Sequence, residues 1–434
     1  MAKKIVSMAH QFNVPCIIAT QFLEELAQND RICSPEMNDI FCTIHQKMDS
    51  IMLAGEGAAS KNSSKCIEIL RDLIGYESGK GDIIMSTVTK KTKIMATAGP
   101  TLQRIEDFEK AIKMNVNEYR IHMGLRNRDF YSYFKNIRVA GEKTGRKVEV
   151  LLDLPSTRPR IEQIKERMIE PGESVKICDS KVFKEDLNVD ILLSNFEAIR
   201  IYLKEGERIV FRDGQVVLEI VRIENEIVEA KCIVTNALLK KNCSSNFPDS
   251  CIDYNVMDDV DLCALKKINK MNLKPDWIAM SFASSQEQVE EIKNVLQKIW
   301  GNEDIRIMAK IENRKGLENI DEIIECVDGI MVARGDLIVN INPIFLPRIQ
   351  LELVNKCNYS GKKVVVATQF FERFALTGII NRSELSDVAL AFREGSDSIM
   401  LAMESGNSKY NFECIKYIND IIECEYQAIK EESL

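Results

Sequence analysis

The chain has 434 residues, of which 45% are hydrophobic and 29% are charged, so it is long enough to bury a large globular core beside smaller domains. Its net charge of −8 argues against nucleic acid as the main partner. No apolar run approaches the ~20 residues of a membrane helix, and no signal peptide is evident at the start, so we expect a cytoplasmic protein that does not bind a membrane.

The 13 cysteines are many for a chain of this kind. None form a C-x-x-C pair, and most lie inside apolar segments, as Cys16, Cys232 and Cys326 do. This pattern favours buried, reduced thiols over a zinc site or a disulfide framework.

An internal repeat opens the chain. The run ATQF at 19–22 recurs at 367–370, and DSIMLA at 49–54 recurs at 397–402, both with an offset of 348 residues and no gap. A gapless match over this length does not arise by chance, so it predicts a duplicated segment. Each copy reads strand, helix, strand, helix, and the first copy ends near a linker at 78–81.

From about residue 161 to residue 250 the pattern changes to short alternating runs. Examples are Arg208–Phe211 and Val216–Ile220, with turn signals at Pro171-Gly172 and Asp213-Gly214. This stretch predicts a small β domain.

Residues 307–337 then read strand, helix, strand, the pattern of a parallel α/β unit. The first apolar run leads to Lys310 and Glu312, and the second, 329–333, is followed by Arg334 and Asp336. One helix is expected between the strands, from apolar residues at spacings of 3 and 4: Leu317, Ile320, Ile323 and Ile324.

The charged residues at these strand ends suggest a site. In parallel α/β folds the carboxyl ends of the strands carry the chemistry. The acids Glu312 and Asp336 could together hold a hard divalent cation, and Lys310 and Arg334 suit an anionic substrate. Each charge alone would more often be a solvated strand end, but four together favour a site.

The runs AKIEN at 309–313 and GIMVARGDL at 329–337 resemble pyruvate kinases, in which they stand in this order and at about this separation. The resemblance extends from about Thr92 to Tyr426 and stops short of the family's C-terminal regulatory domain. It implies a glycolytic phosphotransferase that uses phosphoenolpyruvate, pyruvate, ADP and ATP. Control by sugar phosphates is not expected, and homo-oligomerisation is left open.

The resemblance also implies a fold: a (β/α)8 TIM barrel with an inserted small β-barrel-like lid domain and an N-terminal duplicated βαβα segment. The expected parts are the duplicated segment at 1–84, the barrel at 85–160 and 251–434, and the lid at 161–250. The duplicated unit corresponds to the seventh and eighth barrel strands, so either copy could close the barrel. We favour the C-terminal copy, with the N-terminal copy packed as an appendage or exchanged with a neighbouring chain.

The resemblance further assigns site residues. Glu312 and Asp336 would bind Mg²⁺ or Mn²⁺, and Asp153 belongs to the family's monovalent-cation site. Lys310, Arg120 and Thr368 would be catalytic. The residues expected to bind substrate are Arg160, Arg334, Gly335, Asp336 and Thr368.

Among the departures from the family pattern, two bear on the cation and nucleotide sites. After the second strand, His122 and Gly124 replace the Asn and Ser that bind the monovalent cation, and Leu125 replaces a His of the nucleotide site. Arg158 stands where potassium-dependent members carry Glu and potassium-independent members carry Lys. We therefore expect that K⁺ is not required, because Arg158 supplies a tethered positive charge near Asp153; the alternative is that Arg158 points to solvent.

Three functions remain open from the sequence. The first is a divergent pyruvate kinase. The second is an enzyme that keeps the enolpyruvate site but uses another acceptor or another reaction. The third is a weakly active or inactive barrel that serves as a ligand-binding or assembly component, which the buried charges at 310, 312 and 336 count against.

Overall fold

The computed structural model describes residues 2–19, 21–78, 80, 92–124, 130–164, 168–183, 189–301 and 304–432. The chain divides into two compact units, Met1–Arg120 with Tyr133–Val150 and Asn342–Leu434, and Ile121–Ser132 with Leu151–Ile341. Within the described ranges, no helix is both long and apolar enough to span a membrane. Leu125, and Thr20, the counterpart of Thr368 in the first copy of the repeat, lie outside the described residues.

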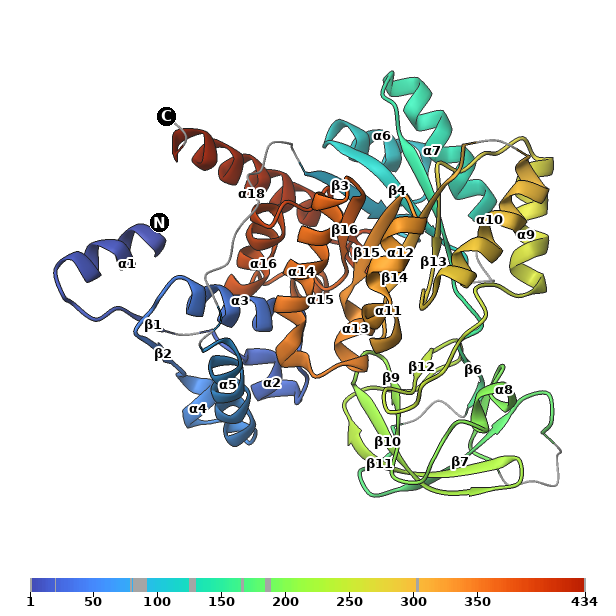
Figure 1. Ribbon diagram of the computed structural model, residues 1–434, viewed down its shortest axis with the longest axis horizontal. Helices are drawn as coiled ribbons and strands as arrows, with labels where there is room; N and C mark the ends of the chain where they lie inside the picture. Colours follow the sequence, from blue (N-terminus) through green and yellow to red (C-terminus); the bar gives the residue numbers. More distant parts are fainter. Residues whose placement is uncertain are drawn as a thin grey trace. The chain divides into compact units, whose positions relative to one another are not determined.

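Eight parallel strands form a closed barrel in the order β13-β14-β15-β16-β17-β3-β4-β5 (Figure 1), which confirms the predicted TIM-barrel class. The C-terminal copy of the repeat supplies its last two strands, as expected. The barrel strands are β3 (Lys93–Thr97), β4 (Val116–His122), β5 (Glu149–Leu154), β13 (Trp277–Met280), β14 (Arg306–Ile311), β15 (Gly329–Ala333), β16 (Lys363–Ala367) and β17 (Ser398–Leu401).

Most of these strands are largely apolar because a parallel strand in a barrel is covered on both faces. All five residues of β15 are buried, as are all four of β13. The barrel helices are α6 (Ile105–Lys113), α7 (Phe130–Thr144), α9 (Asp259–Lys270), α10 (Gln286–Trp300), α11 (Arg314–Glu318), α12 (Ile320–Cys326), α13 (Arg334–Asn340), α14 (Leu346–Tyr359), α15 (Glu372–Thr377), α16 (Arg382–Arg393), α17 (Met403–Gly406) and α18 (Asn411–Glu432), and a 3₁₀ turn, η1 (Pro343–Phe345), precedes α14.

The expectation of a single helix between β14 and β15 is wrong, because the structure has two helices there, α11 and α12, separated at Asn319. The Asn319 side chain donates to the carbonyl of Ser284 at 2.7 Å. Asn competes with the helical backbone for hydrogen bonds, and this interaction with a neighbouring loop holds the break.

A seven-stranded sheet lies between β5 and β13 in the chain, in the order β12-β9-β10-β11-β7-β8-β6. At the turn from β9 to β10, Arg212, Asp213 and Gly214 all have positive φ, which favours Gly at the tightest position. The core of the sheet is a cluster of buried aliphatic and aromatic residues that also includes Phe282, beyond β13. The elements are β6 (Ile161–Ile164), β7 (Ser174–Asp179), β8 (Ile191–Leu193), α8 (Glu197–Arg200), β9 (Arg208–Phe211), β10 (Val216–Glu224), β11 (Ile227–Thr235) and β12 (Ser245–Asn246).

The N-terminal copy of the repeat forms a separate two-stranded parallel sheet with helices around it. Its apolar residues, among them Phe22, Leu26 and Ile40, form a separate core that also includes Ile344 of η1. Its elements are α1 (Ala2–Gln11), β1 (Ile17–Ala19), α2 (Glu24–Asn29), α3 (Ser34–His45), β2 (Ser50–Met52), α4 (Gly55–Ala58) and α5 (Ser63–Glu77).

Candidate active site

The carboxyl ends of β13, β14 and β15 bring together polar side chains from the second unit. The strands are parallel and adjacent, with Ala279 opposite Met308 and Lys310 opposite Met331, so their ends meet at one edge. Lys310 is the fifth residue of β14, Glu312 follows that strand directly, and Asp336 lies in the first turn of α13 after β15. The charged residues at these ends of β14 and β15 are thus fixed by buried strands.

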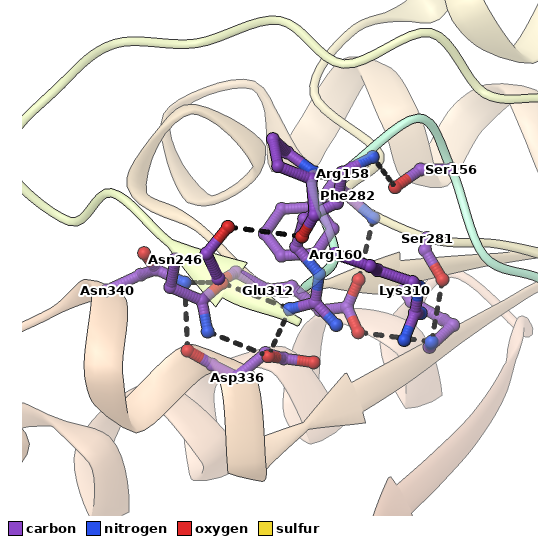
Figure 2. Close-up of polar contacts among 12 residues, drawn as sticks. Ser156, Arg158, Arg160, Asn246, Ser281, Phe282, Lys310, Glu312, Asp336 and Asn340 are labelled. Atoms are coloured by element: carbon purple, nitrogen blue, oxygen red, sulfur yellow. Dashed lines mark hydrogen bonds and ion pairs between the residues drawn. The ribbon is translucent and has the colours of Figure 1, made fainter. Parts of the chain in front are cut away.

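Lys310 is the centre of this group, and Figure 2 shows its side chain among oxygen atoms. Its ammonium lies 3.2 Å from Oδ1 of Asp153 and 3.1 Å from Oε1 of Glu312. It also donates to the hydroxyl of Ser281 at 2.8 Å. The Lys310 residue is only 7% exposed, so these contacts fix the direction in which its charge points.

Glu312 is a buried carboxylate with two kinds of partner. Its Oε2 accepts from the backbone N–H of Phe282 at 2.7 Å, and its Oε1 faces Lys310. Burial raises the pKa of Glu312 to about 7, although the positive charge of Lys310 works in the opposite direction. The nearby negative charge of Asp336 raises the pKa of Glu312 further, so the two carboxylates interact electrostatically.

Asp336 is paired with a different cation. Arg158 donates from Nη1 to its Oδ1 at 2.5 Å, and the amide of Asn246 donates to the same oxygen at 3.1 Å. Burial works to raise the pKa of Asp336, but the charges of Arg158 and Lys310 outweigh it and hold the pKa at about 2. Asp336 is therefore ionised at neutral pH.

Arg158 precedes the seven-stranded sheet, which the resemblance predicts to be a lid, and reaches back to the barrel edge. Its guanidinium lies 4.8 Å from the centre of the Phe282 ring and donates to Oδ1 of Asn246 at 3.0 Å. Its side chain is 9% exposed, so the alternative in which Arg158 points to solvent is wrong. The guanidinium contacts Asp336, while the cation against Asp153 is Lys310.

Two amides complete the group, and sequence reasoning did not assign either of them to the site. Asn340 donates to the backbone carbonyls of Glu312, at 3.0 Å, and Asp336, at 2.9 Å, which ties the two strand ends together. Asn246 lies at the end of the lid sheet, in a run of polar residues that reads as a surface turn. No local pattern marks Asn246, because its role depends on where the chain re-enters the barrel.

Other predicted residues lie in the second unit in different settings. Asp153 is fully buried and accepts from Lys310 and Ser281, and His122 Nδ1 is 3.7 Å from Oδ2 of Asp153. Arg334 is fully buried, at 0% exposed, and Gly335 follows it at the start of α13. Arg160 begins the lid, donating to the backbone carbonyl of Asn242 at 3.4 Å.

Arg120 and Thr368 belong to the first unit, where each has a distinctive local setting. The guanidinium of Arg120 donates to the hydroxyl of Thr97 at 3.2 Å. Thr368 follows β16 with φ of 70°, and Gln369 has φ of 61°. A β-branched residue at positive φ is strained, and such strain gathers at functional sites. The backbone of Thr368 therefore supports a functional role for this position.

The donor set at the barrel edge suits a hard divalent ion. Among the described residues, no three His, Cys, Asp or Glu side chains converge as a closed metal cage would require. Mg²⁺ does not need one, since it usually takes one or two protein carboxylates together with substrate oxygens and water. Glu312 and Asp336 offer two carboxylates on residues that Asn340 links.

Comparison with known proteins gives one consistent result. A family model described as the barrel domain of pyruvate kinase matches residues 89–415. The pyruvate kinase of Dictyostelium discoideum is 31% identical over 349 residues, which cover 79% of this chain and 67% of that protein. That of Staphylococcus haemolyticus is 32% identical over 336 residues, covering 76% of this chain and 56% of its own length. That of Geobacillus stearothermophilus is 31% identical over 348 residues, covering 80% and 58%.

Proposed function

The chain belongs to the pyruvate kinase family, and from this premise we propose that it transfers a phosphoryl group from phosphoenolpyruvate to ADP. The bond between phosphorus and the enol oxygen breaks, a bond to the terminal phosphate oxygen of ADP forms, and the enolate takes a proton on carbon to give pyruvate. The observation that carries the proposal is the buried ammonium of Lys310 held against Asp153, Ser281 and Glu312.

Members of this family generally use a divalent metal ion, and here Glu312 and Asp336 would hold it. When bound, Mg²⁺ or Mn²⁺ supplies positive charge at the enol oxygen and the phosphoryl group. The low pKa of Asp336, about 2, favours this assignment because the carboxylate is ionised without a proton to displace. The charge of Glu312 is balanced by Lys310 until an ion binds.

Lys310 would stabilise the negative charge that develops during transfer. Phosphoryl transfer asks the protein mainly for positioning and charge neutralisation, and a preorganised charge contributes most because it needs no reorientation during the reaction. The ammonium is held by three partners at 2.8 to 3.2 Å, so it is preorganised in this sense. Arg120 and Arg160 would add positive charge toward the phosphoryl group.

The final proton transfer is assigned to the neighbourhood of Thr368. Its strained backbone, with φ of 70°, supports a functional role, and its hydroxyl would take part in delivering a proton to the enolate carbon. The backbone N–H groups near Gly335 and Asp336 would take the substrate carboxylate. Gly335 suits this because no side chain blocks a close approach to its backbone.

The acceptor site departs most from the family pattern. The chain spans 56% to 67% of the length of the three pyruvate kinases compared above. Residues 122 and 124 differ from the family at the monovalent-cation site, and residue 125 differs at the nucleotide site. These changes favour, as a second candidate, an enzyme that keeps the enolpyruvate site but transfers to another acceptor.

One assay separates these functions. Purified protein is mixed with phosphoenolpyruvate and Mg²⁺, with and without ADP, and pyruvate is followed by a coupled reaction. ADP-dependent pyruvate with equal ATP supports the proposal. Pyruvate formed without ADP means transfer to water. No pyruvate in either mixture contradicts the proposal, and pyruvate that forms only when another phosphoryl acceptor replaces ADP supports the second candidate. The variant Lys310→Met, prepared in parallel, is the control for contaminating kinase.

A further inference from the structure

The two copies of the repeat have matching structures as well as matching sequences. At the offset of 348 residues, α2 (Glu24–Asn29) corresponds to α15 (Glu372–Thr377), and α3 (Ser34–His45) corresponds to α16 (Arg382–Arg393), end for end. The strand register repeats too: Ile17 lies opposite Ser50, and Val365 lies opposite Ser398.

Local hydrogen bonds repeat at the same positions. Glu36 accepts from the backbone N–H of Glu25 at 2.7 Å, and Glu384 accepts from that of Arg373 at 2.9 Å. The hydroxyl of Ser60 donates to the carbonyl of Ala27 at 2.7 Å, and Ser408 donates to Ala375 at 2.7 Å. Each copy is therefore folded by its own local contacts in the same way.

The copies pack against each other inside the first unit, and their contacts are reciprocal. Asn38 donates to Asp387 at 2.6 Å. Asn38 lies on α3 and Asp387 on α16, and these two helices, which are each other's counterparts in the repeat, pack together. Each of these helices thus meets its own counterpart in the other copy, as in a two-fold arrangement.

A pair of positions near the start of these helices makes the same contact in both directions between the copies. Ser34 donates from Oγ to Oε1 of Gln369 at 2.6 Å. Their counterparts are Arg382 and Gln21, and Arg382 donates to the backbone carbonyl of Gln21 at 3.5 Å. Two further contacts join the first glutamate of α2 or α15 to an arginine of the other copy, although the two arginines, Arg31 and Arg373, do not occupy corresponding positions.

Those two contacts are ion pairs. Arg31 binds Glu372 through two hydrogen bonds, at 3.0 and 2.8 Å, and Arg373 binds Glu24. Glu24 and Glu372 occupy corresponding positions, one at the start of each helix. At the centre, Cys42 and its counterpart Leu390 lie in one apolar cluster with Phe41 and Leu351. A position that meets its own counterpart lies close to a two-fold axis.

Reciprocity of this kind is the mark of a two-fold, isologous interface, in which residue i of one partner contacts j of the other and j contacts i. We propose that the barrel face formed by α15 and α16 is a self-pairing surface whose natural partner is the same face of a second copy of this chain. Residues 1–78 carry a built-in replica of that face, occupy the surface from within the chain, and keep two copies of the chain from pairing there.

Buried polar and charged groups make the binding of the N-terminal copy to this face specific. The paired groups are buried: Asn38 and Asp387 are 0% exposed, and Asp39 is 3% exposed. Asp39 is also bound by the guanidinium of Arg382 at 2.7 Å. Leaving such groups buried without partners is costly. If the N-terminal copy is displaced, the face of α16 is left with polar groups that a second copy of α16 can satisfy.

The test weakens the occupant without touching the barrel face. The full-length variant Arg31→Glu, Asn38→Asp, Asp39→Lys places like charges against Glu372, Asp387 and Arg382. The matched control is Arg71→Gln, an exposed position of α5 with the same change in net charge. Mass is measured by sedimentation at increasing protein concentration, and hydrogen exchange follows the amides of α3.

We expect the unmodified chain and the control to sediment as monomers of 49.4 kDa, with α3 protected. The triple variant should lose protection in α3 and shift with concentration to twice that mass. Three results would overturn the proposal: an unmodified chain that already dimerises, a released α3 in a protein that stays monomeric, or a triple variant whose α3 remains protected. None of these readouts depends on turnover, so they are independent of the proposed function.

Discussion

Oδ1 of Asp336 lies 2.5 Å from a guanidinium nitrogen of Arg158, a residue 178 positions earlier in the chain. A carboxylate that the resemblance assigns to a metal ion is thus bound by a cation that the protein itself supplies. This pair ties the start of the lid to the barrel edge, and it makes Arg158 part of the site.

Arg158 leads to a prediction about potassium. Because its charge is permanent and is held by Asp336 and Asn246, turnover should need no added K⁺. Rates are compared in K⁺ and in a bulky quaternary ammonium salt at equal ionic strength, and the expected ratio is close to one. Stimulation by K⁺ of tenfold, ~1.4 kcal/mol of transition-state stabilisation, would refute the prediction. In Arg158→Gln, which lacks the charge, the rate should fall. Stimulation of this variant by K⁺ would agree with the prediction, because the ion would then replace the missing charge.

The metal ligands give a second prediction. Glu312→Ala and Asp336→Ala should each abolish Mg²⁺-dependent turnover and weaken Mn²⁺ binding measured by calorimetry. Both residues lie at strand ends, so circular dichroism should show the fold unchanged. Ser281→Ala removes a partner of Lys310 but no carboxylate, and serves as the control. Wild-type Mn²⁺ affinity in both alanine variants would show that the ion binds elsewhere.

Lys310 should matter for both rate and stability. Lys310→Met should lower turnover on the order of 100-fold, the scale of a lost electrostatic stabiliser. It also leaves Asp153 and Glu312 buried without their shared cation, which should cost about 3–5 kcal/mol of unfolding free energy. Urea unfolding measures this loss, and Lys310→Arg, which keeps the charge, should recover most of the stability. A Lys310→Met protein with near-normal rates would mean that the site has been misassigned.

Substitutions of Thr368 and of its counterpart Thr20 test which copy of the repeat takes part in catalysis. Since β16 belongs to the barrel, Thr368→Ala should impair catalysis, while Thr20→Ala, at the corresponding position, should leave the rate unchanged. Steady-state kinetics of the two variants side by side is the measurement. A rate loss in Thr20→Ala instead would show that the N-terminal copy takes part in catalysis.

The interface between the copies should make stability depend on pH. Burial raises the pKa of Glu36 to about 8 and that of Glu384 to about 7, and both line a cavity of about 240 Å³. A carboxyl with a raised folded-state pKa stabilises the fold fully below its unfolded-state pKa and loses that contribution as pH rises through the folded value. The free energy of unfolding should therefore fall between about pH 5 and pH 8, by up to a few kcal/mol.

Burial also raises the pKa values of Asp39 and Glu312, so these groups contribute to the pH dependence of the unfolding free energy as well. The contribution of Glu36 and of Glu384 is therefore measured as the difference between a variant and the wild type. Urea unfolding across this pH range compares the wild type with Glu36→Gln and Glu384→Gln. Each variant should show a flatter dependence on pH than the wild type. Identical slopes in all three proteins would mean that neither carboxyl titrates in this window.

Much of the fold could be read from local pattern. Buried parallel strands are continuous apolar runs, so β13 to β17 stand out, and each is followed by residues with helical spacing. The repeat was equally clear, because an offset of 348 residues without a gap needs no structure to detect. Lys310, Glu312 and Asp336 could be predicted to lie together because the order of the strands alone places these residues at one edge.

What only the tertiary structure decided depends on contacts between distant residues. The two copies of the repeat have nearly the same local sequence signals, so local pattern cannot say which joins the barrel; the strand order puts β16 and β17 there. The break at Asn319 comes from a hydrogen bond to Ser284, in a different loop. Arg158 and Asn246 reach Asp336 across 178 and 90 residues, and their direction is set by the fold of the lid that lies between them in the chain. Spacing along a chain determines periodicity, but partners of this kind are chosen by the three-dimensional path that brings them into hydrogen-bonding distance.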